Sequence, residues 1–567
     1  MKKYIYLTTL LCTILLISCE DFLDKGPLDK LSEAAYWERA SDAEYAVNGL
    51  YECFYELDGG GYWSPGGAPY LDVCTDLIYL RNSWEFGLMP FSDGSMNSDN
   101  GWIYAFWSKK YQYIRYANYF FENVDKVKNL MTDDEYKNLC GQARVVRAFC
   151  YLRLVQGYGD VPLVKETLGT DALPSRTPAT EVMDFVLSEL KLAADELPET
   201  QSDDAHGRIF KHVANAYAAR AALHYAGYYG KTEHYQTAVD ALSQIVGSGQ
   251  FELYEKNSDL VNNFNEIFWA ANEGKENKEI IFSDQFIADK RPNNISTCFA
   301  GTGWKALQAT QACIDLFECT DGWQANGIQF ADMNKYRNTK NLSSPLLGKS
   351  AKYDPLNEFT NRDPRLTATF FHPTISTTGG TISRTGEFWE PANATFSPDR
   401  DNDAYSFKKL VDPTNFNPVY YYGNSENNFP LIRYSDMLLL YAEALNEAGI
   451  SDPLGKTPLF YVNAVRDRVG MPAIVSSDPS EIREIIKHER KVELLAENVL
   501  MWDYMRWKDY EKTMPNGSAF YGYRRETYGQ ESVLFQTKLK TYPKYNLWPI
   551  PTAEMRNNKN MKQNTGW

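Results

Sequence analysis

Residues 143–164 read ARVVRAFCYLRLVQGYGDVPLV, and this stretch predicts a long helix with an abrupt end. Gly157 and Gly159 stand directly ahead of Pro162, and glycine followed closely by proline is a typical signal for a helix C-terminus. A helix is therefore expected from Gly141 to Gly157, and the chain should continue from it in a non-helical connection.

The same helical spacing recurs on both sides of this stretch. Apolar residues from Trp102 to Phe121 form a stripe at helical spacing, which predicts a helix there. Further helices are expected at about 178–197, 207–226, 232–247, 434–448, 457–469 and 479–508. Small side chains at Ala214, Ala218 and Ala221 would let a neighbouring helix approach closely. Antiparallel helices with short links favour hairpins of the tetratricopeptide type, although no strict repeat of about 34 residues aligns.

Two loop-rich tracts interrupt the helices. Residues 58–101 and about 250–429 are rich in Asn, Thr, Gly, Pro and aromatic residues. Long irregular stretches in a compact protein are usually functional. The sequence therefore predicts a mainly α single domain at 19–567. In it, a helical scaffold at about 102–248 and 430–510 supports a loop-rich ligand-binding region with a few short strands.

The N-terminus has the features of an export signal. Two lysines near the start precede an uncharged run at residues 4–17, which is shorter than the ~20 residues of a membrane-spanning helix. The run ends in LISC at residues 16–19, which resembles a bacterial lipobox. Residues 1–18 are therefore expected to be a signal peptide. Cys19 is expected to carry the lipid that anchors the mature chain to a membrane.

Charge and cysteine content exclude several classes of protein. The 567-residue chain has a net charge of −16, which becomes −18 when the two positive charges of Lys2 and Lys3 leave with the signal peptide. This acidity argues against nucleic-acid binding, which needs clustered Lys and Arg. After Cys19 seven cysteines remain, an odd number with no CxxC pair, so neither a disulfide framework nor a zinc site is predicted.

Several motifs, in order along the whole chain, resemble the SusD/RagB family of Bacteroidetes surface lipoproteins. They are CEDFLDKGP at 19–27, the stretch at 143–164, TGWKALQATQACIDLFECTDG at 302–322, DPRLTATF at 363–370, IRYSDMLLLYAEALNEAG at 432–449, HERKVELLAENVLMWDYMRW at 488–507 and LWPIPTAEMRNNKNMKQNTGW at 547–567. The chain departs from the family pattern at Asn498 and Leu500, where the family usually has Gly and Arg. The sequence therefore does not predict the local helix geometry at Asn498, or whether this chain forms the ion pair that the family's Arg would make at position 500.

The resemblance implies a mainly α fold with four tetratricopeptide-like units, in an outer-membrane lipoprotein at the cell surface. It also implies binding of an oligosaccharide or polysaccharide without catalysis, with a SusC-like TonB-dependent transporter as partner. Two other interpretations stay open: a peptide ligand, which some relatives of the family make plausible, and a glycoside hydrolase. With 74 acidic residues a pair of carboxylates in a cleft would arise by chance, so composition does not exclude the hydrolase.

Loop aromatics are the candidates for sugar contacts, because a flat ring covers the C–H face of a sugar while polar side chains bond to its hydroxyls. Clusters of such aromatics on a surface mark interaction sites. Trp84, Trp304 and Trp323 are predicted to stack on sugar rings, and Asp76, Arg81 and Asn100 to bond to hydroxyls, with Trp63 and Trp102 as further candidates. Each tryptophan has a competing interpretation as a cap on the core, since Trp is usually largely buried.

Other motifs carry little weight. GTGWKA at 301–306 has the shape of a dinucleotide-binding turn but follows no strand in a βαβ unit. Asp399, Asp401 and Asp403 have the spacing of a calcium loop, but Ala404 stands where glycine is needed, and a solvated acidic loop is the competing interpretation. The chain has no HExxH, no GxSxG and no P-loop, so no metal, cofactor or catalytic residue is predicted.

Overall fold

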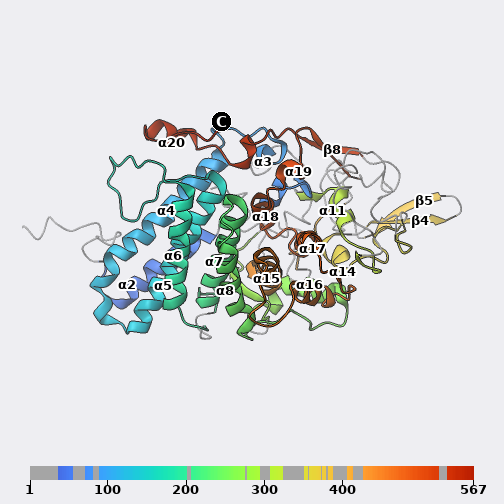
Figure 1. The fold of residues 1–567 in the computed structure, drawn as a ribbon, viewed down its shortest axis with the longest axis horizontal. Helices are drawn as coiled ribbons and strands as arrows, with labels where there is room; N and C mark the ends of the chain where they lie inside the picture. Colours follow the sequence, from blue (N-terminus) through green and yellow to red (C-terminus); the bar gives the residue numbers. More distant parts are fainter. Residues whose placement is uncertain are drawn as a thin grey trace, which may run out of the picture.

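The computed structural model describes residues 36–54, 70–80, 89–200, 206–274, 277–293, 307–323, 350–354, 357–371, 373–378, 381–386, 405–412, 426–522 and 533–567. Helices dominate this part of the chain, and strands are few and short (Figure 1). The mainly α fold predicted from the sequence is therefore confirmed. Among the described helices, none is both long enough and apolar enough to cross a membrane.

The helices and strands have the following bounds. The helices are α2 (Ala40–Leu50), α3 (Met89–Asp93), α4 (Gly101–Asn123), α5 (Asp133–Tyr158), α6 (Ala179–Glu196), α7 (Lys211–Tyr229), α8 (His234–Gly247), α9 (Leu260–Asn265), α11 (Gln311–Leu316), α14 (Pro364–Thr369), α15 (Tyr434–Ala448), α16 (Pro458–Asp467), α17 (Pro479–Glu493), α18 (Leu500–Trp507), α19 (Tyr510–Thr513) and α20 (Thr552–Asn557). The strands are β1 (Ile78–Leu80), β2 (Ile280–Asp284), β3 (Leu307–Ala309), β4 (Pro373–Thr378), β5 (Thr381–Gly386), β6 (Phe429–Arg433), β7 (Ser518–Gly522) and β8 (Val533–Lys538). The strands form antiparallel pairs: β1 with β3, β2 with β6, β4 with β5, and β7 with β8.

The helical scaffold is a row of neighbours. Helices α4 to α8 each pack against the next, at the left of Figure 1. Helix α8 packs against α15, which packs against α16 and α17, so the row continues across the loop-rich tract that separates these helices in the sequence. The consecutive helices α4/α5, α6/α7 and α15/α16 pack side by side, as expected for the helical hairpins that the family resemblance implies.

Helix α5 contains the beginning of the 143–164 stretch and starts earlier than predicted. Thr132 Oγ1 accepts the N–H of Glu135 at 3.2 Å, and Glu135 Oε2 accepts the N–H of Thr132 at 2.7 Å. This reciprocal cap fixes the start at Asp133 instead of Gly141. At the other end, Gly159 takes a φ of 74° and donates its N–H to the carbonyl of Val155, so the glycine-rich stop is confirmed.

The predicted single helix at 479–508 is wrong, because the chain turns between α17 and α18. Ala496 and Asn498 in this turn have φ values of 66° and 60°, in the left-handed region that favours glycine. Asn is among the non-glycine residues that tolerate this conformation best. Asn498 therefore takes the place of the family's usual glycine without loss of the turn.

The C-terminal segment packs on the end of α5. Trp548 is buried, with its ring centroid 5.2 Å from that of Phe106 and 5.6 Å from that of Tyr158. Its N–H donates to the carbonyl of Gly157 at 2.7 Å. A Cβ at Gly157 would lie 2.7 Å from a ring carbon of Trp548, so glycine is required for this close approach. The motifs at 143–164 and 547–567 thus form one packed unit.

A buried ionic cluster joins the loop-rich half to α16 and α17. The Glu493 carboxylate accepts hydrogen bonds from Arg468 at 2.6 Å, Arg365 at 3.0 Å and Arg433 at 3.1 Å. Burial alone would raise the pKa of Glu493, but the three guanidiniums hold that pKa well below its usual value. The other members are Glu279, Glu318, Asp363, Lys409, Arg466, Glu489 and Glu497. Buried charges are tolerated only when paired, so the cluster specifies how these segments meet.

Candidate functional site

Two short strands bring together chain segments that are far apart in the sequence. Strand β1 pairs antiparallel with β3, and Leu80 lies opposite Leu307. Arg81 and Trp84 follow Leu80 in the chain, and Trp304 precedes Leu307. Because paired residues of antiparallel strands lie side by side, Leu80 and Leu307 mark the same end of the strand pair. We call this end the loop edge.

The strand pair rests on buried side chains. Tyr79 of β1 stacks on Phe535 of β8, with ring centroids 4.6 Å apart. The hydroxyl of Thr310, just after β3, donates to the carbonyl of Asp76 at 3.0 Å. Three distant parts of the chain therefore form one platform beneath the loop edge.

Two buried lysines hold the segment that leads into β1. Lys538 Nζ donates to the carbonyl of Val73 at 2.9 Å, and Lys540 Nζ donates to the carbonyl of Cys74 at 3.2 Å. Burial lowers the pKa of both lysines, because an ammonium group loses its hydration there. Each lysine satisfies a main-chain carbonyl instead of a ligand, which gives it a supporting role.

Asp72 and Asn498 tie the same segment to the turn ahead of α18. Asp72 Oδ2 accepts the N–H of Ala496 at 3.0 Å, and Asn498 Oδ1 accepts the N–H of Leu71 at 3.0 Å. Burial raises the pKa of Asp72 to about 7. The departure from the family pattern at Asn498 therefore adds a hydrogen bond to the support of the loop edge.

The structure places three of the predicted sugar contacts in the interior, so these predictions are corrected. Asp76 is 0% exposed and accepts the hydroxyl proton of Tyr504 at 2.6 Å. Trp102 is 8% exposed, and its ring lies 5.5 Å from that of Trp548. Trp323 is 7% exposed, and its ring lies 5.0 Å from that of His488. Both indoles cap the core, and neither presents an open face to a sugar.

Asn100 is half-buried and caps α4, because its Oδ1 accepts the N–H groups of Trp102 at 2.9 Å and Ile103 at 3.2 Å. Three tryptophans of α4 and α18 also lie against the core: Trp107 and Trp502 are buried, and Trp507 is half-buried. The remaining candidates lie outside the described residues and stay predictions: Trp63, Arg81, Trp84, Trp304, the lipidation site Cys19 and the acidic run Asp399–Asp403.

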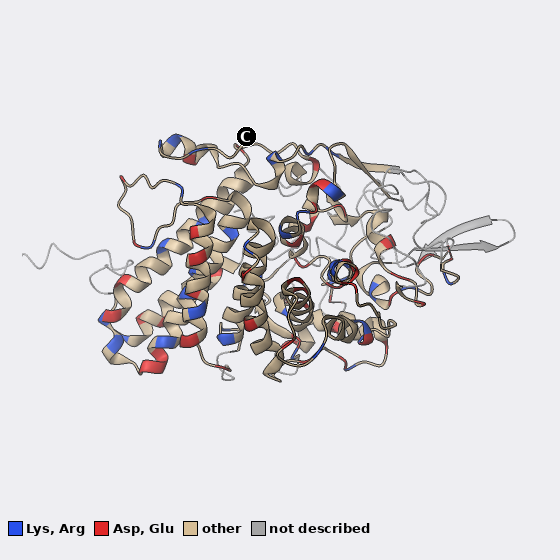
Figure 2. Cartoon of the chain, viewed as in Figure 1, with Lys and Arg blue, Asp and Glu red and all other residues tan. Residues whose placement is uncertain are grey.

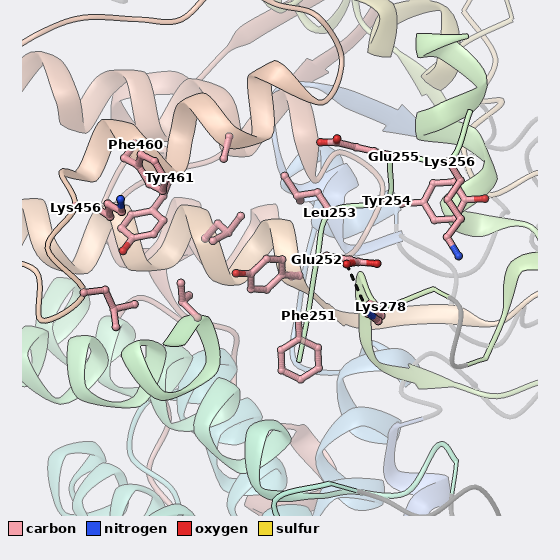
Figure 3. A pocket seen from close by; sticks show the side chains of 15 residues that line it. Phe251, Glu252, Leu253, Tyr254, Glu255, Lys256, Lys278, Lys456, Phe460 and Tyr461 are labelled. Carbon is pink, nitrogen blue, oxygen red and sulfur yellow. Dashed lines mark hydrogen bonds and ion pairs between the residues drawn. The ribbon is translucent and has the colours of Figure 1, made fainter. Parts of the chain in front are cut away.

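The sequence did not indicate a pocket of about 710 Å³ in the helical half. Helices α8, α15 and α16 form its floor, and residues 251–256 form one wall (Figure 3). Its volume lies within the range of ~300–1,000 Å³ typical of ligand pockets. Val246, Phe251, Tyr434, Leu438, Leu454, Phe460, Tyr461 and Ala464 supply apolar surface, and Glu252, Glu255, Lys256, Lys278 and Lys456 supply charge. The only sequence signal was the aromatic content of the segment that follows α8.

Charges of both signs are interspersed on the scaffold. In Figure 2, residues of both signs occur on the helices α4, α5 and α6. Within the described part of the chain, no group of three or more His, Cys, Asp and Glu residues has the geometry to hold a metal ion.

Comparisons with known proteins agree with the fold. Residues 265–567 match the family model described as "SusD family", and residues 21–223 match the one described as "Starch-binding associating with outer membrane". SusD-like protein P2 of Formosa agariphila is 25% identical over 100% of this chain and 99% of its own length. The starch-binding protein SusD of Bacteroides thetaiotaomicron is 24% identical over 97% and 96%.

Solved structures show the same architecture. The crystal structure of a SusD-like protein from Bacteroides fragilis is 25% identical, with a TM-score of 0.73 over 96% of this chain and 100% of that one. A SusD-like carbohydrate binding protein from the same species is 22% identical, with a TM-score of 0.74 over 93% and 100%. The family model that covers residues 265–567 spans more than half of the sequence. This chain therefore belongs to the SusD family.

Proposed function

We propose that this chain is a non-catalytic glycan-binding lipoprotein of the outer membrane, and that it delivers oligosaccharides to a SusC-like TonB-dependent transporter. The relatives' names, a starch-binding protein and a carbohydrate binding protein, support a carbohydrate ligand. The observation that supports the proposal is the β1–β3 pairing, in which Leu80, just before Arg81 in the sequence, lies opposite Leu307, which follows Trp304 closely.

In the proposed site, two indoles stack on the sugar and a guanidinium bonds to its hydroxyls. Trp84 and Trp304 supply the flat rings that cover the C–H faces, and Arg81 supplies up to five N–H donors in a fixed fork. A rigid support lowers the entropic cost of binding, because the residues that lead into β1 are held before the ligand arrives. The buried contacts of Lys538, Lys540 and Asp72 provide that support.

One described carboxylate with a raised pKa, Glu273, lines a pocket without a second carboxylate. A glycosidase needs two carboxyl groups facing each other across a cleft, about 5–10 Å apart, usually with the pKa of one raised. Burial raises the pKa of Glu273 to about 8, and Glu273 lines a second pocket of about 270 Å³ next to His206, Arg208 and Phe210. However, Glu273 is the only carboxylate among the residues that line this pocket, and it accepts the N–H of Asn428.

The lipid anchor places the protein at the membrane surface without a membrane-spanning segment. An acyl chain contributes about 0.8 kcal/mol for each buried methylene, so several chains on Cys19 would hold the protein lastingly. The acidic residues that follow, Glu20, Asp21 and Asp24, suit a solvated tether. This location would set the loop edge within reach of extracellular polysaccharide and of a transporter in the same membrane.

The test is a double substitution at the loop edge. A panel of soluble polysaccharides is screened by affinity electrophoresis, and a bound glycan is then titrated by calorimetry against wild type and Trp84→Ala/Trp304→Ala. We expect at least a tenfold loss of affinity, which corresponds to about 1.4 kcal/mol, because the variant loses both rings that are proposed to cover the C–H faces of the sugar. Tyr104→Ala, at a 44% exposed aromatic of α4, is the control and should bind as wild type does.

Two results would remove the proposal. Equal affinity of the double variant and wild type would show that the loop edge does not contact the glycan. The purified chain is also incubated with any polysaccharide that it binds. New reducing ends in that mixture would show that the chain is a hydrolase instead of a binding protein.

A further inference from the structure

The 710 Å³ pocket belongs to a different part of the molecule from the loop edge. Helices α8 and α16 lie at the bottom of Figure 1, whereas α3 and β8 lie at the top. The pocket shares no lining residue with β1, β3 or β8. The pocket is therefore separate from the proposed glycan site.

The wall of the pocket is a stretch of chain with unpaired main-chain groups. Residues 251–257 form no helix, strand, turn or bend. In the described part of the chain, the N–H groups of Glu252, Leu253 and Glu255 donate no hydrogen bond. Exposed, unpaired N–H and C=O groups in an unbent stretch are a template for another extended chain.

This wall is fixed in place from the inside. The N–H of Tyr254 donates to Glu279 Oε2 at 2.8 Å, and the Tyr254 hydroxyl donates to Glu266 Oε2 at 3.1 Å. Tyr254 is 6% exposed, while Glu252 and Glu255 on either side are exposed. The stretch is thus anchored by one buried side chain and keeps its neighbouring peptide groups open, which lowers the ordering cost of pairing.

The floor of the pocket is aliphatic as well as aromatic. Leu454 is 38% exposed and Phe460 is 49% exposed, and both line the pocket together with Leu438, Val246 and Ala464. Aliphatic side chains gain free energy by covering apolar surface, about 25 cal/mol for each Å² removed from water. The floor is therefore suited to apolar side chains of a polypeptide.

The charges at the rim are unevenly paired. Lys278 Nζ lies 3.5 Å from Glu252 Oε2, so these two charges offset each other. Lys456 Nζ lies 4.7 Å from the centroid of the Phe460 ring, and within the described part of the chain it makes no ion pair. This end of the pocket, beside Phe460, is therefore ready to receive a carboxylate.

We propose that this pocket docks an extended segment of a partner polypeptide. The segment pairs its main chain with residues 252–255, inserts apolar side chains against Leu438, Leu454 and Phe460, and presents an acidic side chain or its C-terminal carboxylate to Lys456. This mode is related to strand addition, except that the receiving stretch is a single irregular segment and not the edge of a sheet; main-chain bonds would give affinity and side-chain contacts specificity.

The experiment uses peptides selected for binding. Random 12-residue peptides are displayed on phage and panned against the full mature chain, and an enriched peptide is labelled with fluorescein and titrated by anisotropy. We expect Phe460→Ala to weaken its binding at least tenfold. Tyr116→Ala, at a 46% exposed aromatic of α4, is the matched control and should stay within twofold of wild type.

A second variant and a second measurement distinguish loss of binding from misfolding of Phe460→Ala. Lys456→Glu replaces an exposed side chain and should weaken binding at least threefold at low salt, with a smaller effect at high salt because screening reduces the repulsion. Amide hydrogen exchange should slow at residues 252, 253 and 255 when the enriched peptide is added to wild type, and should not slow in Phe460→Ala.

Three results would overturn the proposal. Panning could enrich no peptide. An enriched peptide could bind Phe460→Ala as tightly as wild type and leave residues 252–255 unprotected. A soluble polysaccharide could protect these amides where no peptide does, which would assign the pocket to carbohydrate.

Discussion

Glu493→Gln tests whether the buried ionic cluster governs stability. The substitution keeps the size of the side chain and removes its charge. Arg365 would retain Asp363 and Glu489, and Arg433 would retain Glu279 and Glu497. Arg468 would be left with Glu279 as its one remaining carboxylate in the cluster.

The expected loss of unfolding free energy follows from the carboxylates that each arginine keeps. Removing one partner of a buried ion pair typically costs ~3–5 kcal/mol, because the remaining charge stays buried without compensation. Arg468 still faces Glu279, and the amide oxygen of Gln can still accept a hydrogen bond. We therefore expect a loss near the lower end, about 3 kcal/mol in the free energy of unfolding.

Urea unfolding followed by tryptophan fluorescence at pH 7 measures this loss. Glu252→Gln is the control, since Glu252 pairs with Lys278 at 3.5 Å and the two side chains are 57% and 49% exposed. An exposed pair contributes only about 0–1 kcal/mol. The pKa of Glu493 is depressed in the folded state, so its contribution is present above the unfolded value of ~4.3 and is lost as pH falls below it. Equal losses for the two variants, or a gap that persists in acid, would refute the reasoning.

Two further predictions concern the support of the loop edge and the α5 terminus. Asp72 has a folded pKa of about 7, raised above its unfolded value of ~3.9, so its protonation stabilises the fold at low pH and that contribution is lost as pH rises through 7. The unfolding free energy of Asp72→Asn should therefore decline less than that of wild type between pH 4 and pH 7. If urea unfolding at a series of pH values gives the same decline for both proteins, the assignment is wrong. Gly157→Ala should cost about 1–3 kcal/mol, because the new Cβ would lie 2.7 Å from the Trp548 ring. A melting temperature equal to that of wild type would show that the ring moves aside freely.

The sequence allowed the helices to be predicted wherever periodicity and end signals agreed. The expected helix at 434–448 matches α15, and the one at 178–197 differs from α6 by one residue at each end. The break between α17 and α18 was missed because Ala496 takes a left-handed conformation that its residue type does not announce. Hydrophobic periodicity shows which face of a helix is apolar. It does not show a turn when the apolar spacing continues on both sides of that turn.

The site was harder to predict, because loop aromatics look alike whether they cap the core or face solvent. Trp102 and Trp323 follow polar and glycine-rich segments, yet both rings are buried by residues distant in sequence. Asp76 is polar but fully buried, since Tyr504 satisfies it from α18. Only tertiary contacts separate these cases. The 710 Å³ pocket was missed for the same reason, because its floor consists of helices from both sides of the loop-rich tract.

The supports of the loop edge act mainly on the main chain. Lys538 and Lys540 donate to carbonyls, Thr310 donates to the carbonyl of Asp76, and Asp72 accepts a main-chain N–H. Such bonds fix the path of residues 70–80 whatever side chains follow at position 81. The chain could therefore exchange the residues that contact a glycan without any change in the support. The 710 Å³ pocket differs, because Leu438 of α15 lines it and is also buried in the core, so a substitution there would change the packing of the scaffold as well as the pocket.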